Sequence, residues 1–385
     1  MNIDKLENKE KIAIIVVGYN RIKSIKRLLG SLVKANYSTK DIPLVISIDC
    51  SGVEELYKYV RDFEWPYGEK YLNIQNVRLG LKNHIFQCGD LTKHFKAVIL
   101  LEDDLYVSPY FYNYVVATVD KYGNDNKIAG IALYKNEING YIGLPFHPIN
   151  NGADVFALQE TCTWGQCWTA EMWNNFRSWL KDNEDAYMQV DMWDTIKNWS
   201  KAWSKYYNAY IVSTNRYFIF PYISLTTNFS DAGVHGKTNN TIVQVNLLNG
   251  EKKYELPNFC SLIKYDIYFN NKELYKYVGL NEDELCVDLY GTNINYSRKR
   301  YLLTPLQLPY KSIHDYALNL RPHDLNIMLN ISGNEIHLYD TLCPTGNKRE
   351  FKIPIKCLNY HFNINRKFAV RILIDQIKNL LKQIF

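Results

Sequence analysis

The sequence lacks the cysteine spacing of a zinc site and the long apolar runs of a membrane protein. Its eight cysteines are scattered and no Cys-x-x-Cys pair occurs, which argues against zinc and favours free thiols. No apolar run approaches the roughly 20 residues that span a bilayer. Residues 1–5 include an acid and no apolar core follows them, so we expect no signal peptide. These absences predict a cytoplasmic protein.

A strong charge of either sign is also missing. The 45 basic and 40 acidic side chains leave a formal net charge of +5. No dense stripe of lysine and arginine with interleaved aromatic residues occurs, so we expect no nucleic-acid partner. The 385 residues are enough for two domains, or for one large domain with an appendage.

What the first part of the sequence does contain is an alternation of apolar runs with helical patterns. Apolar runs at 11–17, 43–49, 71–77 and 97–101 are typical of strands, and the stretches between them have helical spacing. This alternation predicts an α/β fold with a doubly wound, mostly parallel sheet. In such sheets, ligands bind at the carboxyl ends of the strands.

Three consecutive carboxylates, Glu102, Asp103 and Asp104, follow the apolar run 97–101. Neighbouring carboxylates repel one another, and a divalent cation removes that repulsion. A hard cation held by one or two carboxylates usually completes its shell with substrate phosphates. The triplet therefore predicts a metal-bridged diphosphate site. Other polar residues that follow predicted strands are expected at the same edge of the sheet: Asn20, Arg21 and Asp49.

The pattern changes near residue 240. Residues 242–247, 285–290 and 325–339 have the composition of antiparallel strands, the last with a turn at Gly333-Asn334. We therefore expect a main domain over residues 10–240, a smaller β-rich region over residues 241–360 and a terminal helix over residues 361–385.

Residues 366–385 predict a basic amphipathic helix. Its apolar residues recur at helical spacing: Phe368, Ile372, Leu373, Ile377, Leu380, Leu381 and Ile384. Its basic residues are Arg366, Lys367, Arg371, Lys378 and Lys382. Such a helix either docks on its own domain or lies on an anionic membrane surface. In the second case the protein contacts the inner face of the membrane peripherally.

Seven short segments carry a resemblance to a known family. They are residues 15–21, 45–50, 79–84, 101–111, 163–168, 193–194 and 233–236. In order and spacing they resemble the nucleotide-sugar glycosyltransferases of the GT-A fold, most closely the N-acetylglucosaminyltransferase I type and its bacterial relatives. The resemblance covers roughly residues 10–240, and no family is evident for the C-terminal third.

The resemblance implies an inverting transferase that moves a sugar from a UDP-sugar to a hydroxyl of a glycan or lipid-linked glycan, as in bacterial surface polysaccharide synthesis. UDP-N-acetylglucosamine is the favoured donor, with UDP-galactose and its N-acetyl form as alternatives. The cofactor implied is Mn²⁺ or Mg²⁺, with Asp104 as the main ligand and His235 as a second ligand. Donor-binding roles are implied for Asn20, Arg21, Asp49, Lys82, Glu102, Asp103 and His235.

Transfer also needs a carboxylate that accepts the proton of the acceptor hydroxyl. Asp194 is the first candidate for this base, and Asp191 is the second. On a helix these two side chains point about 200° apart, so only one faces a cleft. Trp164 and Trp168 are candidates to stack against the acceptor sugar, whereas Trp173 is expected in the core.

Two other functions are compatible with this fold. A nucleotidyltransferase that activates sugars also uses carboxylate-bound Mg²⁺, but it needs a glycine-rich basic loop after the first strand. Residues 18–21 contain a single glycine, which argues against that function. The other alternative is a non-catalytic carbohydrate-binding protein, which the intact acidic triplet disfavours.

Overall fold

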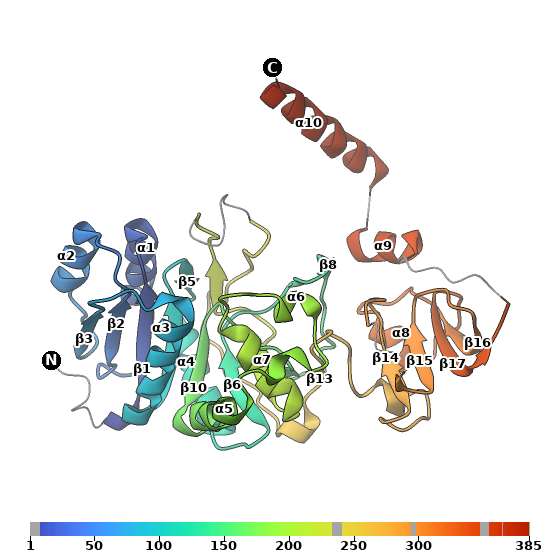
Figure 1. The fold of residues 1–385 in the computed structure, drawn as a ribbon, viewed down its shortest axis with the longest axis horizontal. Helices are drawn as coiled ribbons and strands as arrows, with labels where there is room; N and C mark the ends of the chain where they lie inside the picture. Colours follow the sequence, from blue (N-terminus) through green and yellow to red (C-terminus); the bar gives the residue numbers. More distant parts are fainter. Residues whose placement is uncertain (1–7, 233–240, 294–297, 347–353, 364, 385) are drawn as a thin grey trace. The chain divides into compact units, whose positions relative to one another are not determined.

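The computed structural model describes residues 8–232, 241–293, 298–346, 354–363 and 365–384 (Figure 1). The chain divides into two compact units. Unit 1 comprises residues 1–137 and 150–269, and unit 2 comprises residues 138–149 and 270–385. The predicted boundary near residue 240 is therefore corrected to 269/270. A short strand at Lys264–Tyr265 pairs with the main sheet of unit 1 and keeps the segment after 240 in that unit.

In the described part of unit 1 the main sheet has nine strands, in the order β13-β9-β11-β6-β10-β4-β1-β2-β3. Their bounds are β1 Asn8–Gly18, β2 Leu44–Ile48, β3 Lys70–Ile74, β4 Phe95–Glu102, β6 Ile128–Ala132, β9 Val155–Leu158, β10 Gln166–Thr169, β11 Tyr217–Pro221 and β13 Lys264–Tyr265. Strands β1 to β4 pair in parallel, while β10 runs antiparallel to β4 and β6. The predicted mostly parallel sheet is thus confirmed.

Helices α1 to α4 of unit 1 alternate with strands, whereas α5, α6 and α7 follow one another between β10 and β11 (Figure 1). Their bounds are α1 Ile22–Val33, α2 Glu54–Asp62, α3 Gly80–Gly89, α4 Phe111–Tyr122, α5 Ala170–Asn183, α6 Asp194–Lys197 and α7 Ser204–Ser213. Short 3₁₀ segments are η2 Asp90–His94, η3 Ala186–Met188 and η4 Phe259–Ser261. Helix α1 lies in the first predicted helical stretch, between the apolar runs 11–17 and 43–49, and buries Ile25, Leu28, Leu29 and Leu32 at helical spacing. The continuous burial of residues 12–17 in β1 is typical of a sheet covered on both faces.

The register of the parallel strands aligns their carboxyl ends. Val17 of β1 lies opposite Glu102 of β4, and Gly18 lies opposite Ile48 of β2. The loops that begin at residues 19, 49 and 103 therefore leave the sheet at the same edge. A second pairing brings in a distant segment, because β5 (Leu105–Val107) runs antiparallel to β12 (Thr226–Asn228).

Unit 2 has its own small sheet in the order β14-β15-β17-β16, which confirms the predicted β-rich region. The elements are β14 Leu285–Val287, β15 Tyr301–Thr304, β16 Tyr310–Tyr316, β17 Ile336–Pro344, α8 Asp324–Met328, α9 Ile355–Phe362, α10 Arg366–Ile384 and η5 Leu274–Lys276. The hairpin β7 Ile138–Asn139 and β8 Leu144–Pro145 completes the unit. Leu274, Leu303, Ile327 and Leu338 contribute to its core.

Two predicted strands in the C-terminal part are corrected. Residues 242–247 form loop with one isolated bridge, from Leu247 to Ser224. Residues 324–328 form helix α8, and the strand begins only at Ile336. The side-chain oxygen of buried Asn326 accepts hydrogen bonds from the backbone amides of Asn319 and Leu320, which fastens the loop before α8 to this helix.

The predicted terminal helix is present as α10 (Figure 1). Its described side chains from Lys367 to Lys378 are all exposed, including Phe368, Leu373 and Ile377. No helix within the described residues is long and apolar enough to cross a membrane.

Candidate functional site

The acidic triplet lies where β4 ends and the chain turns into β5. Glu102 is the last residue of β4, and Asp103 and Asp104 form the turn. Asp103 is 3% exposed. Because β12 pairs with β5, residues 229–231 lie beside the same turn, and the amide of Phe229 donates to the carbonyl of Asp104 at 3.0 Å. The site is thus built from the ends of β1 and β4 together with the segment after β12.

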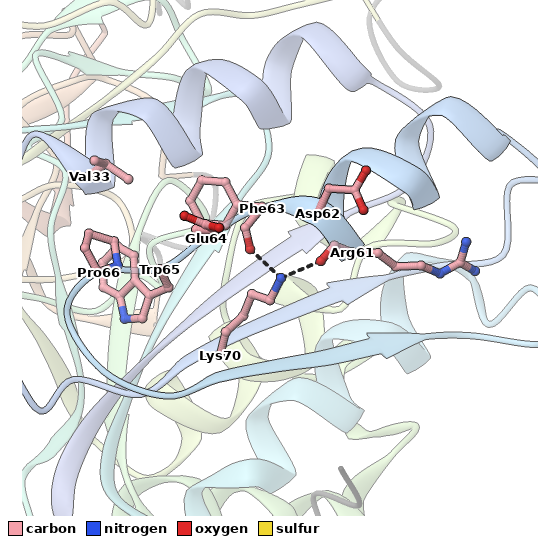
Figure 2. Close-up of a pocket in the computed structure, with 8 residues that line it drawn as sticks. All are labelled: Val33, Arg61, Asp62, Phe63, Glu64, Trp65, Pro66 and Lys70. Atoms are coloured by element: carbon pink, nitrogen blue, oxygen red, sulfur yellow. Dashed lines mark hydrogen bonds between the residues drawn. The ribbon is translucent and has the colours of Figure 1, made fainter.

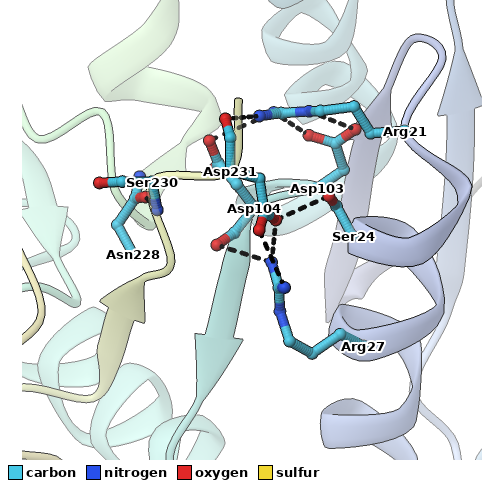
Figure 3. Close-up of polar contacts among 8 residues, drawn as sticks. All are labelled: Arg21, Ser24, Arg27, Asp103, Asp104, Asn228, Ser230 and Asp231. Carbon is cyan, nitrogen blue, oxygen red and sulfur yellow. Dashed lines mark hydrogen bonds and ion pairs between the residues drawn. The ribbon is translucent and has the colours of Figure 1, made fainter. Parts of the chain in front are cut away.

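Arg21 joins the first strand to the triplet (Figure 3). Its Nη2 donates to Asp103 Oδ1 and, at 3.2 Å, to Asp104 Oδ2. Its Nε lies 3.4 Å from Asp103 Oδ2. The predicted convergence of Arg21 with Asp103 and Asp104 is therefore a feature of the structure.

Two carboxylates of the triplet, those of Glu102 and Asp103, are difficult to ionise. Burial, followed by the charges of Asp104 and Asp103, raises the pKa of Glu102 to about 8, although Arg21 opposes this shift. Burial also raises the pKa of Asp103 to about 6, again against the effect of Arg21. One guanidinium thus compensates the crowded acids incompletely, and a divalent cation at this place would relieve the remaining repulsion.

The segment after β12 adds an acid that the sequence analysis missed. Asp231 accepts hydrogen bonds from Ser24 Oγ at 2.7 Å and from both terminal nitrogens of Arg27, and its backbone carbonyl accepts one from Arg21 at 3.0 Å (Figure 3). Burial opposes ionisation of this carboxylate, but the bonds from Arg27 and Ser24 outweigh burial and lower its pKa. Its position two residues before the motif 233–236 was the available signal.

Asp49 lies at the same edge but has different partners. Its Oδ1 accepts from the amides of Cys50 and Leu79 at 2.8 Å each, and its Oδ2 accepts from the amide of Gly80 at 3.0 Å. Gly80 has a positive φ of 75°, which suits glycine. Asp49 therefore fastens the start of α3 to the end of β2. Its predicted contact with the donor base stays a prediction.

The other predicted donor residues are less closely gathered. Asn20 is exposed in the loop after β1. Lys82 on α3 pairs with Glu184 at 2.6 Å and lies over the ring of Tyr206 at 4.2 Å. His235 lies outside the described residues. Arg21 thus contacts the triplet directly, whereas Lys82 forms an ion pair with Glu184, the residue after α5.

The tryptophans predicted at the acceptor side separate into two classes. Trp164 is half-buried and packs edge-on against Tyr134 at 4.7 Å. Trp168 is completely buried, where its ring stacks with Tyr207. An acceptor role for Trp168 is therefore corrected to a core role, because all four residues of β10 are buried. Trp173 lies in the same core, as expected.

The two candidate bases lie in and before α6. Asp194 is the first residue of α6, with a side chain 70% exposed and 3.6 Å from Lys197. Asp191 precedes the helix, and its Oδ1 accepts a hydrogen bond from the hydroxyl of Tyr268 at 2.8 Å. The helical separation expected of this pair is corrected, since only Asp194 belongs to the helix.

The donor set can be tested against a divalent cation. Across the described ranges, no cluster of three or more ligating side chains is placed to hold a metal ion. Magnesium-like cations are nevertheless bound by one or two carboxylates together with water and substrate phosphates. Asp104, beside the crowded Glu102 and Asp103, fits a cation held in that way.

A separate hollow lies at the opposite edge of the sheet (Figure 2). It has a volume of about 700 Å³, and its lining includes Trp65 and Lys70. Lys70 is the first residue of β3, so this hollow lies at the amino ends of the strands. The ammonium of Lys70 donates to the carbonyls of Arg61 and Val60 at 2.8 and 3.2 Å. Lys70 thus satisfies the carbonyls at the end of α2 and has a structural role.

Comparison with known proteins agrees with the geometry of the N-terminal part. Residues 1–141 match the model of the GNT-I family. The match spans α1 and the acidic triplet, and it confirms the predicted resemblance over these residues. No curated protein matches the chain at a significant level.

Several solved structures share weak similarity with the chain. Residues 1–349 of S. aureus TarS in complex with UDP-GlcNAc are 16% identical, with 58% of this chain and 60% of that chain covered and a TM-score of 0.36. A mannosyltransferase of Pyrobaculum calidifontis in complex with GDP-Man and Mn²⁺ is 14% identical, with 42% of this chain and 45% of that chain covered and a TM-score of 0.32. GalNAc-T7 with UDP, GalNAc and Mn²⁺ is 13% identical, with 56% of this chain and 43% of that chain covered and a TM-score of 0.35. The chain thus covers less than two thirds of each structure, and likeness at this level carries no argument about chemistry.

Proposed function

We propose that this chain is a glycosyltransferase that moves a sugar from a nucleoside-diphosphate sugar to a hydroxyl of an acceptor. The observation that carries the proposal is the crowded acidic triplet at the carboxyl edge of the sheet, compensated by Arg21 alone among its side-chain partners in the described residues. The match of residues 1–141 to the GNT-I family supports the same chemistry.

The site residues divide the work of donor binding. Asp104 would hold Mn²⁺ or Mg²⁺, which when bound neutralises charge on the leaving diphosphate. Arg21 lies within reach of both Asp103 and Asp104, so its guanidinium can pair with a donor phosphate when Asp104 takes the cation. Asp103 would face the donor ribose or sugar. Glu102, whose pKa burial and the neighbouring acids raise in the absence of a cation, would hold groups of the nucleotide.

The donor and the acceptor are finer parts of the proposal. The resemblance to the N-acetylglucosaminyltransferase I type favours UDP-N-acetylglucosamine as the donor, with UDP-galactose and UDP-N-acetylgalactosamine as the alternatives. The acceptor would be a glycan or a lipid-linked glycan of a bacterial surface polysaccharide. Transfer would proceed by one displacement with inversion, because one carboxylate accepts the proton of the acceptor hydroxyl.

Asp194 remains our first candidate for that base, and Asp191 remains the second. The carboxylate of Asp194 is 70% exposed beside Lys197 and is therefore accessible to an acceptor, whereas the bond from Tyr268 orients Asp191. We expect Asp194→Asn to retain donor binding and to lower the transfer rate by about 10²–10⁴-fold. Asp191→Asn is the matched control. Loss of transfer in Asp191→Asn alone would reverse the assignment.

The proposed function is tested with a panel of nucleotide sugars and Mn²⁺. Release of UDP from a UDP-sugar, dependent on metal and lost in Asp104→Asn, is the expected result. Release of pyrophosphate from UTP and a sugar phosphate would instead identify a nucleotidyltransferase. If neither UDP nor pyrophosphate is released while the protein still binds sugar, the protein is a carbohydrate-binding protein.

We further propose that α10 holds the protein on an anionic membrane surface. Its exposed apolar side chains Leu373 and Ile377 are accompanied by the cations Lys367, Arg371 and Lys378, against the single described acid Asp375. Exposed apolar area with excess positive charge is typical of helices that lie in the lipid headgroup region.

Flotation with vesicles measures this contact separately from catalysis. We expect binding to phosphatidylglycerol-containing vesicles, weak binding to neutral vesicles and loss of binding in Leu373→Asp/Ile377→Asp. Leu329→Asp is the matched control, because Leu329 is an exposed apolar residue elsewhere in unit 2. A dimer that dissociates in the double variant, without vesicle binding, would show that a second copy covers the helix.

A further inference from the structure

The segment after β12 is fastened to α1 beside the acidic triplet. Asp231 receives hydrogen bonds from Ser24 and Arg27 of α1, and its carbonyl receives one from Arg21. The guanidinium of Arg27 also lies over the ring of Phe229, 3.8 Å from the ring centroid. These contacts place two arginines and three aspartates in one half-buried cluster (Figure 3).

Within this cluster the two arginines have different partners. Arg21 contacts the carboxylates of Asp103 and Asp104. Arg27 gives both terminal nitrogens to Asp231 and reaches Asp104 only at its backbone carbonyl, at 3.5 Å. Among the described residues the Nε of Arg27 has no hydrogen-bond partner, and within those residues the carboxylate of Asp231 is the only anion that this guanidinium pairs with. The charges are thus paired so that Asp104 faces one guanidinium instead of two.

We propose that Asp231 is a positioning residue for the metal site, because it holds Arg27 away from the carboxylate of Asp104. This inference rests on the proposed role of Asp104 as the cation ligand. An arginine side chain 23% exposed keeps its charge and needs a nearby anion when its partner is removed. Asp104 is the acid of the triplet that Arg27 already contacts, through its backbone carbonyl at 3.5 Å, so its carboxylate is the one that we expect Arg27 to approach. A second guanidinium on Asp104 would compete directly with a divalent cation for the same oxygens.

The proposal is distinct from a role of Asp231 as a ligand. A ligand contributes its own oxygen, so its loss cannot be corrected by removing a neighbouring cation. A positioning residue acts through Arg27, so removal of Arg27 corrects its loss. The double variant Arg27→Gln/Asp231→Asn therefore separates the two roles.

The test measures Mn²⁺ bound in the presence of UDP, from the electron paramagnetic resonance signal of free Mn²⁺, without acceptor and without turnover. We expect Asp231→Asn to weaken Mn²⁺ binding about tenfold, a coupling of ordinary size between interacting sites. The double variant should bind Mn²⁺ within about threefold of the wild type. Asp231→Glu, which keeps the negative charge, should stay nearer to wild type than Asp231→Asn does.

Control variants make each outcome decisive. Asp120→Asn neutralises an acid of α4 that pairs with Lys96 near the amino end of β4, the end opposite to the acidic triplet, and should leave Mn²⁺ binding unchanged. Thermal melting of every variant identifies any that fail to fold. The inference is overturned if Asp231→Asn binds Mn²⁺ as the wild type does, or if the single and the double variant both bind it weakly. In either case the wild type should still bind Mn²⁺ more tightly than Asp104→Asn does. Absence of that difference overturns the proposed metal site itself.

Discussion

Two acidic strand ends lie at the same edge of the main sheet, and they are neutralised in opposite ways. At the end of β2, Asp49 receives three backbone amides. At the end of β4, the carboxylates of Asp103 and Asp104 receive the side chain of Arg21. Amides belong to the fold and cannot leave, whereas a side chain can change partners. From this difference we propose that the first acid maintains the fold and that the second group exchanges Arg21 for a ligand.

The largest difference should appear when Asp104 is neutralised. We expect Asp104→Asn to abolish Mn²⁺-dependent binding of UDP and to reduce transfer by about 10²–10³-fold or more, as when one stabilising group is removed from an active site. Its melting temperature should not fall, since removal of one of three crowded acids reduces repulsion. Isothermal titration measures the binding of UDP, an assay of UDP release measures the transfer, and thermal melting measures the stability. Normal transfer in this variant would contradict the proposal that the acids at the end of β4 bind a ligand.

Asp49 should respond in the opposite sense. Asp49→Asn replaces a carboxylate that accepts three amide bonds, and we expect the free energy of unfolding to fall by about 2 kcal/mol. Urea denaturation measures this change, and binding of UDP at low temperature measures any separate effect on the donor. A stable variant with weakened binding of UDP would show that Asp49 is a ligand, as the sequence resemblance implies, and that the comparison is wrong.

The pH dependence of stability provides a third test. Because the pKa of Glu102 is raised from 4.5 to about 8, the folded protein retains a proton that the unfolded chain loses as the pH rises. Stability contributed at this site is therefore highest below about pH 4.5 and decreases up to about pH 8. Glu102→Gln cannot ionise, so its melting temperature should exceed that of the wild type increasingly from pH 5 to pH 8. A pH-independent difference would contradict the raised pKa.

The smallest effect concerns the loop that follows Asp49. The hydroxyl of Tyr57 accepts from the amides of Ser51 and Gly52 at 2.7 and 2.8 Å. Tyr57→Phe leaves these amides without that acceptor and should cost about 1 kcal/mol of unfolding free energy. Urea denaturation checks the value, and Mn²⁺ binding should not change. A change in metal affinity would indicate that the two strand ends are coupled.

The sequence was sufficient to predict the parts of the site that follow parallel strands. Arg21 and the triplet could be placed at one edge because the carboxyl ends of parallel strands meet there, and the register of β1 with β4 confirms it. Asp231 could not be placed in this way. It reaches the site through the antiparallel pairing of β12 with β5, and such pairing of short, distant strands leaves little signal in one sequence.

Other errors have equally physical causes. Tryptophan spacing does not distinguish a ring that faces a ligand from one that is buried, and Trp168 lies in a strand whose residues are all buried. The boundary at 240 was wrong because the segment from 241 to 269 is mostly irregular and joins the main sheet through the two residues of β13. Composition alone could not assign such a segment to either unit.

The division of unit 2 into two stretches of chain has a consequence for its synthesis. The hairpin of residues 138–149 emerges from the ribosome long before residues 270–385, with which it forms one unit. Until then Pro145 lacks the hydroxyl of Tyr290 that its carbonyl accepts at 3.2 Å. The hairpin therefore lacks the rest of its unit while unit 1 is still being translated. A chain that ended at residue 269 would contain the hairpin without the segment with which it forms a unit. Because unit 2 is made from two separate stretches of the chain, recombination at a single junction could not add or remove the whole unit.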